Sequence, residues 1–111
     1  MASDEQLVAR VRASLVQERQ IVEKAMFGRR MFMYSGNLAV GVAGDELMVR
    51  VGAENVRAAL AEPHVRRCVM SGRPMADWIL VAGEGVRADG PLDAWVAQGV
   101  AFARGRVKDD R

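Results

Sequence analysis

Residues 21–51 of the chain read IVEKAMFGRRMFMYSGNLAVGVAGDELMVRV, and this stretch decides the fold. Four short apolar runs, at residues 21–27, 31–34, 38–42 and 47–51, are separated by turn-length segments. Each separator contains glycine together with residues that tolerate a positive φ or bond their own backbone. We therefore predict an antiparallel meander of three or four strands.

The third of these runs should present two unlike faces, because side chains alternate along a strand. The larger side chains share one face and the smaller ones share the other: Leu38, Val40 and Val42 against Ala39 and Gly41. The small face would let a helix approach closely. Residues 31–34 and 78–81 are apolar on both faces, so three short helices would leave apolar surface for a partner or a second copy.

Helical periodicity appears before the meander. Ser3 followed by Gln6 has the form of a capping box, in which each side chain satisfies backbone donors at a helix start. The residues that follow place four apolar side chains on one stripe: Leu7, Val8, Val11 and Leu15. This pattern predicts a first helix over about residues 4–17.

Two further helices are expected after the meander. Apolar residues at helical spacing predict a short helix over residues 54–62, which Pro63 ends. After a glycine-rich loop at residues 82–90, Pro91 opens a last helix. One side of that helix is apolar: Leu92, Trp95, Val96, Gly99 and Phe102.

A hairpin is expected between these two helices, from the runs at residues 65–70 and 75–81 and the turn at 71–74. The full order is helix, three or four strands, helix, two strands, helix. Such an order predicts the α+β class, a two-layer fold in which helices cover an antiparallel sheet of five or six strands.

Length and composition describe one ordinary globular domain. The chain has 111 residues, of which half are apolar. We predict a single domain over residues 1–111, with its core at about 4–104 and a flexible tail at 105–111. The net charge of +2, from 16 basic and 14 acidic residues, argues against a dedicated DNA-binding protein.

Nothing in the sequence predicts a disulfide, a metal, a cofactor or a membrane segment. Cys68 is the single cysteine, and no cluster of cysteine and histidine could hold zinc. The N-terminus opens with polar residues, and no run approaches the roughly 18 apolar residues of a membrane span. A cytoplasmic location is expected.

The apolar stripes and strand faces also predict which residues form the core. They are Leu7, Val11, Leu15, Phe27, Val40, Val49, Leu60, Ile79 and Trp95. Trp95 is expected to matter most for stability, because truncating a buried aromatic residue costs about 3 to 5 kcal/mol.

Two sets of residues are candidates for binding. The arginines best placed for phosphates are Arg29, Arg30, Arg66, Arg67 and Arg73. Arg66 and Arg67 would point to opposite faces of one strand, so solvated arginines at strand ends are the alternative. A surface for a protein partner, comprising Met31, Met33 and Tyr34, is weighed against filling of the core by thioethers.

No recognisable set of catalytic residues is present, and we expect no enzyme. His64 and Cys68 lack a carboxylate, an asparagine or a third metal ligand nearby in sequence. The acidic residues of the last third are explained in part by turns and helix starts, with an acid/base pair or a magnesium site as the alternative: Asp77, Glu84, Asp89 and Asp93. An enzyme would be favoured by a pocket that joins two or more of His64, Cys68, Asp77, Asp89 and Tyr34.

Several motifs occur in a fixed order: Lys24-Ala25-Met26-Phe27-Gly28, the meander ending at residues 47–51, the turn Gly72-Arg73-Pro74-Met75, and the final helix around Trp95. Over about residues 20–103 this order resembles the N-terminal domain of the TfoX/Sxy family. Arg29 stands where that family often has a second glycine. The resemblance implies a small α+β fold of the secretion-chaperone-like type, shared with YjbR-like domains.

The best-known members of that family are bacterial regulators linked to natural competence, and they commonly carry a second, helical C-terminal domain. The resemblance therefore favours a non-enzymatic regulatory or protein-interaction domain, whose partner is a protein or a second copy bound through the apolar sheet face. A DNA-associated regulator that binds phosphates through arginines is the first alternative, and an uncharacterised small enzyme is the second.

Overall fold

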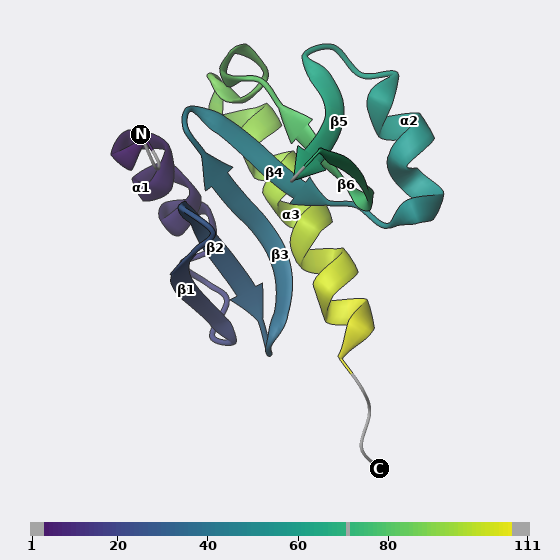
Figure 1. Ribbon diagram of the computed structural model, residues 1–111. Helices are drawn as coiled ribbons and strands as arrows, with labels where there is room; N and C mark the ends of the chain where they lie inside the picture. The colour runs from purple at the N-terminus through teal and green to yellow at the C-terminus, as the bar shows by residue number, and fades with distance from the viewer. Residues whose placement is uncertain (1–3, 71, 108–111) are drawn as a thin grey trace.

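A six-stranded antiparallel sheet with helices on one side forms the computed structural model, which describes residues 4–70 and 72–107 (Figure 1). This is the expected α+β class, with the sheet at the upper end of the expected strand number. Along the chain the elements are α1 (Glu5–Ser14), β1 (Ile21–Met26), β2 (Arg29–Tyr34), β3 (Asn37–Ala43), β4 (Glu46–Arg50), the 3-10 helix η1 (Ala53–Asn55), α2 (Val56–Leu60), β5 (Val65–Met70), β6 (Arg73–Val81), the 3-10 helix η2 (Gly83–Val86) and α3 (Asp89–Arg106).

The strand order in the sheet is β1-β2-β3-β4-β6-β5. The four strands of the meander are neighbours, as hairpin turns require, and every pairing is antiparallel. The last hairpin joins the meander through β6, so that β5 lies outermost. The two edges of the sheet are therefore β1 and β5.

The first helix is capped by Asp4. One carboxylate oxygen of Asp4 accepts hydrogen bonds from the backbone N–H groups of Gln6, at 2.9 Å, and Leu7, at 3.4 Å. Ser3, the residue expected to cap this helix, lies outside the described residues. The helix ends at Ser14, three residues earlier than expected.

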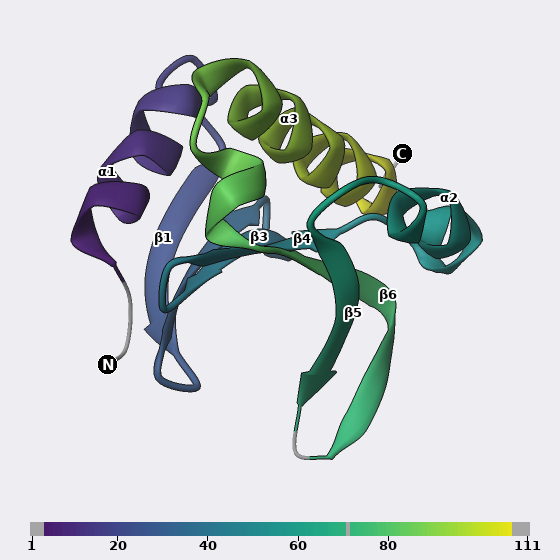
Figure 2. The same cartoon turned by 90° about the horizontal axis from the view of Figure 1, so that it is seen from above.

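The main core lies between the sheet and the helices, which Figure 2 shows together on one side of the strongly curved sheet. Its buried members include residues of α1, the central strands and α3. Gly99 of α3 is needed for this packing, because a Cβ at that position would lie 2.5 Å from the carbonyl oxygen of Ala39 in β3. The absence of a side chain at Gly99 brings the helix axis close to the sheet.

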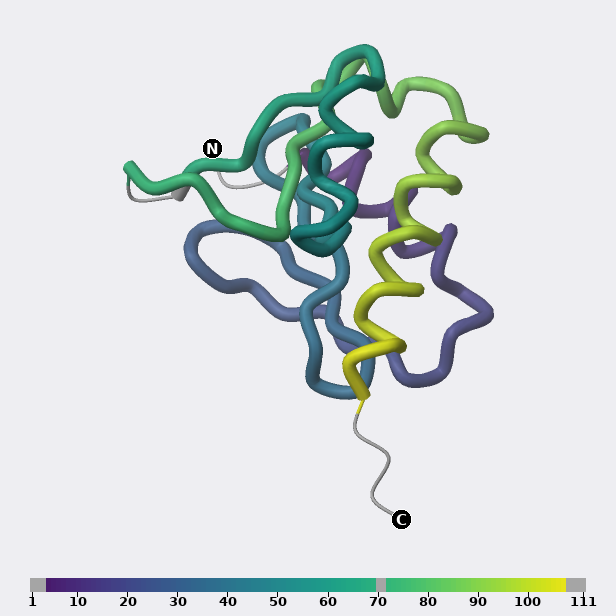
Figure 3. Tube along the Cα trace, turned by 90° about the vertical axis from the view of Figure 1, so that its right-hand side faces the viewer, coloured from purple at the N-terminus to yellow at the C-terminus, as the bar shows by residue number. Residues whose placement is uncertain are grey.

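A second apolar cluster fills the other side of the sheet, where no helix packs within the described residues. Its buried members are Met31, Met48, Cys68 and Trp78. The β1–β2 and β5–β6 hairpins both project from the sheet on this side, away from the helices (Figures 2 and 3). The curvature of the sheet thus lets strand side chains bury one another without a covering helix.

The two faces of β3 differ from the expectation in two respects. The expected approach of a helix to a small face of Ala39 and Gly41 is wrong. Gly41 faces Met31, whose Sδ would lie 2.5 Å from a Cβ there, whereas Ala39 belongs to the main core and α3 packs on that side at Val40. Leu38 does not share a face with Val40. A register shift pairs Phe32 with Val40 but Met33 with Leu38, so that Ala39 is an extra residue and Leu38 turns toward the second cluster.

Most of the residues expected in the core lie there, with one clear exception. Leu7, Val11, Leu15, Val40, Val49 and Ile79 are buried, and Leu60 and Trp95 are partly buried against the same cluster. Phe27 is 68% exposed and does not belong to the core. The strand ends at Met26, and Phe27 is a turn residue with a φ of 57°, so the alternation of the strand does not extend to it.

The C-terminal part of the chain is more regular than expected. The tail predicted at residues 105–111 is helical as far as Arg106, where α3 ends. Residues 108–111 lie outside the described residues.

Candidate interaction surface along the β1 edge

The outer edge of β1 is long and regular. β1 pairs with β2 over six consecutive residues, from Ile21 opposite Tyr34 to Met26 opposite Arg29, without a register shift. No strand within the described ranges pairs with its other side. An edge of this kind presents unpaired backbone N–H and C=O groups, and natural proteins usually interrupt or cover such edges.

Exposed apolar side chains gather around this edge. Five large hydrophobic residues of the described chain are exposed, and three of them flank or belong to β1. Val16 precedes the strand and is 75% exposed, Val22 lies within it and is 54% exposed, and Phe27 follows it and is 68% exposed. We call these three residues and the outer side of β1 the β1 edge surface.

Phe27 occupies a backbone conformation that large residues seldom adopt. Phe27 and Gly28 form the two-residue β1–β2 turn, with φ values of 57° and 71°. Turns with positive φ at both central positions favour Asn-Gly. Bulky side chains are sterically disfavoured at positive φ, and Asn is among the few residues that tolerate it. The fold thus keeps an exposed aromatic ring at a strained position, a combination found at functional sites.

A shallow groove lies at the opposite end of β1, between the end of α1 and the start of the strand. Its volume is about 250 Å³, and we call it the β1 groove. It is lined by Arg12, Leu15, Val16, Glu18, Ile21, Glu23 and Phe32.

The carboxylate of Glu23 in this groove is held by two arginines. Arg12 donates from Nε at 2.9 Å and from Nη2 at 2.8 Å, and Arg30 donates from Nη1 at 2.6 Å. These contacts, led by the hydrogen bonds from Arg12, lower the pKa of Glu23 from 4.5 to about 2. The groove therefore holds an ionised but compensated carboxylate beside apolar walls.

The other edge of the sheet is less suited to pairing. The pairing of β5 with β6 is irregular between Arg67 and Val69, where the single residue Cys68 of β5 stands against residues 75–78 of β6. Two consecutive arginines, Arg66 and Arg67, also lie on this strand. Irregular pairing and cations commonly protect the edges of sheets from adding a strand. By this criterion the β5 edge is protected, whereas the regular β1 edge is open to strand addition.

The arginines predicted to bind phosphates do not form one patch. Arg30 binds Glu5 and Glu23 on the helix side, with Nη2 at 3.0 Å from Glu5. Arg66 makes a bidentate ion pair with Glu46, at 2.6 and 2.7 Å. It lies opposite Leu80 whereas Arg67 lies opposite Ile79, which places the two on different faces of the sheet. Arg29 and Arg73 lie at the starts of β2 and β6.

Met31, Met33 and Tyr34 likewise do not share a surface. Met31 is 2% exposed inside the second cluster. Tyr34 packs against the main core on the helix side, where its ring lies 5.1 Å from the guanidinium carbon of Arg104. Sequence patterns did not single out Val22, and they placed Phe27 in the core. The Phe27-Gly28 pair, followed by two arginines, was nevertheless a signal for a turn.

The residues considered for catalysis are each held by a different neighbour. His64 lies 4.0 Å from Glu84, Cys68 lies 3.7 Å from the sulfur of Met75, Asp77 binds Arg50 at 2.8 Å, Asp89 binds Arg10 at 3.1 Å and Tyr34 binds Arg104 at 3.4 Å. Burial raises the pKa of the Cys68 thiol, which disfavours its thiolate. Across residues 4–70 and 72–107, no three His, Cys, Asp or Glu side chains could hold a metal ion together.

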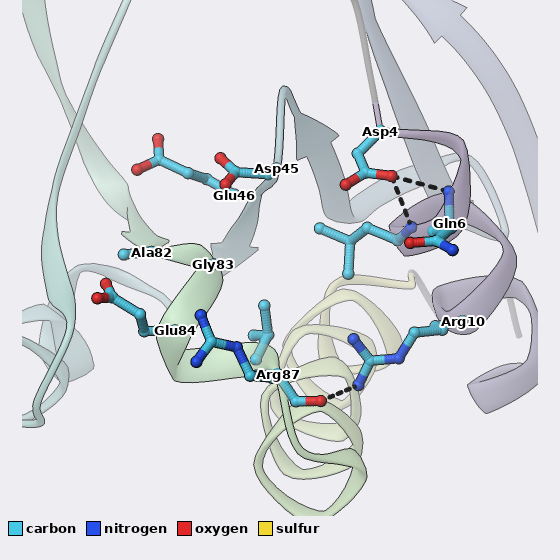
Figure 4. A pocket seen from close by; sticks show the side chains of 11 residues that line it. Asp4, Gln6, Arg10, Asp45, Glu46, Ala82, Gly83, Glu84 and Arg87 are labelled. Atoms are coloured by element: carbon cyan, nitrogen blue, oxygen red, sulfur yellow. Dashed lines mark hydrogen bonds between the residues drawn. The ribbon is translucent and has the colours of Figure 1, made fainter.

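A polar pocket of about 430 Å³ lies between the start of α1, the β3–β4 turn and η2 (Figure 4). Arg10 spans one side of it, where its Nη2 donates to the carbonyl oxygen of Arg87 at 3.0 Å. Asp4 caps α1 and Glu46 binds Arg66, so two of its carboxylates are already engaged. The polar side chains of this pocket therefore serve to join neighbouring elements of the fold.

Comparison with known proteins gives one match. A family model of the TfoX N-terminal domain matches residues 13–103. The chain belongs to the TfoX N-terminal domain family. The match covers all six strands of this TfoX domain, the β1 edge surface and most of α3. No curated protein and no solved structure matches the chain.

Within the part of this TfoX domain that the structure describes, no helix is long and apolar enough to cross a membrane.

Proposed function

We propose that this TfoX N-terminal domain is a non-enzymatic regulatory module that binds another polypeptide along the β1 edge. The observation that carries the proposal is the coincidence of an uninterrupted edge strand with three of the five exposed large hydrophobic residues. A cytoplasmic location in a bacterium and a link to natural competence belong to the proposal on the strength of family membership.

The binding mode is the addition of a strand. An extended segment beside β1 would satisfy the outward backbone groups of the strand, which supplies affinity without regard to sequence. Val22 would then contact a side chain of the added strand on the side away from the helices. Phe27 at one end and the β1 groove at the other would select which segment binds, because aromatic anchors and the pockets that receive them dominate interface energies.

Capture of partners from a lysate of the native host tests this proposal with matched variants. Val22→Lys places a charge on the β1 edge and should abolish capture of any partner that adds a strand there. Val69→Lys introduces the same charge at a half-exposed valine of the opposite edge and serves as the control. Equal capture by the wild type and both variants would show that the β1 edge is not the binding surface.

A second candidate function is DNA association, favoured by three cations on the two projecting hairpins. Lys24, Arg29 and Arg73 have no ion pair among the described side chains. Phosphate contacts release counterions, so binding through these residues must weaken steeply as salt is raised. A fluorescence titration with duplex DNA that shows no binding at about 50 mM salt, where such contacts are strong, would remove this function.

A further inference from the structure

We propose that the polypeptide bound at the β1 edge is a second copy of this chain, paired antiparallel through β1 about a two-fold axis beside Val22. This inference rests on the proposed function, since both use the β1 edge, and it names the partner. The two sheets would join into one continuous sheet with the helices of both copies on the same side.

The faces of β1 restrict how two copies can pair. Ile21, Glu23 and Ala25 lie opposite Tyr34, Phe32 and Arg30 on the helix side of the sheet, and Val22, Lys24 and Met26 lie on the other side. Directly opposed residues of an antiparallel pair share a face. A two-fold axis perpendicular to the sheet therefore permits pairing about a single residue of β1, because each residue then opposes one of the same face.

Charge selects among these pairings. An axis at Glu23 would oppose two carboxylates, and an axis at Lys24 would oppose two ammonium groups, both of which are unfavourable. An axis at Val22 opposes two half-exposed valines and places each Glu23 opposite Ile21 of the other copy. Axes at Ile21, Ala25 and Met26 also avoid opposed like charges, but Val22 is the one residue of β1 that is an exposed large hydrophobic, so an axis at Val22 covers exposed apolar surface.

The ends of the strand are complementary under the same symmetry. Because the two copies of β1 run in opposite directions, the end that carries Phe27 meets the start of the other β1, where Val16 and the β1 groove lie. The contact occurs twice, so all three exposed residues of the β1 edge surface are covered in both copies. A knob and a groove at opposite ends of one strand fit together when that strand meets its own reversed copy, as a two-fold interface requires.

Equilibrium sedimentation of the wild type and three variants tests the assignment. The wild type should form a dimer, Val22→Lys should remain a monomer, and the control Val69→Lys should dimerise as the wild type does. Phe27→Asn should weaken dimerisation at least about tenfold while its melting temperature stays at or above that of the monomeric Val22→Lys variant, because Asn accepts the positive φ of the turn. A folding defect at Phe27 would instead lower the melting temperature below that of Val22→Lys.

Disulfide trapping tests the register. Two Val22→Cys chains place their thiols directly opposite each other across the proposed axis, so mild oxidation should yield a covalent dimer. Lys24→Cys is the control on the same face and strand, and its two thiols would be separated by about 13 Å along the strands, too far to bond. Equal trapping of both variants would overturn the Val22 axis, and a wild type that stays monomeric at high micromolar concentration would overturn the dimer.

The failure of this inference can be told apart from failure of the proposed function. A monomeric wild type whose captured partner is lost on Val22→Lys would show that the edge binds another protein and not a second copy. A monomeric wild type whose capture is unaffected by Val22→Lys would contradict both.

Discussion

Gly99 of α3 lies against the carbonyl oxygen of Ala39 in β3, so closely that a β-carbon at Gly99 would be 2.5 Å from that oxygen. The same β-carbon would lie 2.6 Å from a methyl carbon of Val40. This contact sets the distance between α3 and the centre of the sheet, and the neighbour on one side is backbone, which cannot rotate out of the way.

Gly99→Ala should therefore destabilise the domain even though alanine favours a helix by about 1 kcal/mol over glycine. Overpacking in a core commonly costs about 1 to 3 kcal/mol, so we expect a net loss. Gly105→Ala in the same helix is the control, because a β-carbon there would meet nothing within 4 Å beyond the backbone of its own helix, and it should stabilise. Urea unfolding of both variants measures the difference, and a Gly99→Ala variant as stable as Gly105→Ala would contradict the close packing of α3.

Trp78→Ala should be more damaging than Trp95→Ala. Trp78 is 3% exposed in the second cluster, whereas Trp95 is only partly buried at the margin of the main core. Truncation of a fully buried aromatic residue costs about 3 to 5 kcal/mol, and a partly exposed ring loses less. Chemical denaturation of the two variants gives the order, and a larger loss at Trp95 would mean that the second cluster contributes little to stability.

The order of the helices and strands could be predicted from the sequence, because glycine-containing turns and hydrophobic periodicity are local signals. What could not be predicted depends on contacts between strands. The extra residue at Ala39 turns Leu38 to the other face, and no local pattern marks it. The burial of Trp78 likewise could not be predicted from a local pattern, because it depends on the curvature that brings two hairpins to one side of the sheet.

The candidate site was harder to predict than the fold. Phe27 looked like a core residue because it continues an apolar run, and its exposure follows from the place where the chain reverses. Val22 is exposed because β1 lies at the edge of the sheet, which is a property of the strand order. The arginines predicted to bind phosphates do not form one patch, because side chains alternate between the two faces of a strand, as Arg66 and Arg67 do.

The pH dependence of stability should report the ion pairs of Glu23. Its pKa is lowered from 4.5 to about 2 in the folded domain, so its contribution to stability is present above pH 4.5 and is lost as the pH falls toward 2. Glu23→Gln should remove this part of the acid sensitivity, so that the melting temperature falls less between these pH values. Glu54→Gln, at an exposed carboxylate of η1, is the control. An unchanged acid profile in Glu23→Gln would show that Arg12 and Arg30 do not stabilise the carboxylate.

The reactivity of Cys68 should report opening of the β5–β6 hairpin. The thiol is 2% exposed, lies 3.7 Å from the sulfur of Met75 and has a pKa raised by burial. A thiol reagent should therefore modify the native domain far more slowly than the unfolded chain, because reaction requires both access and the thiolate. Trp78→Ala should accelerate modification, since it removes the largest neighbour in the cluster. Ser35→Cys in the exposed β2–β3 turn provides a fast-reacting reference, and a Cys68 that reacts at the same rate as this reference would show that the second cluster does not hold the hairpin closed.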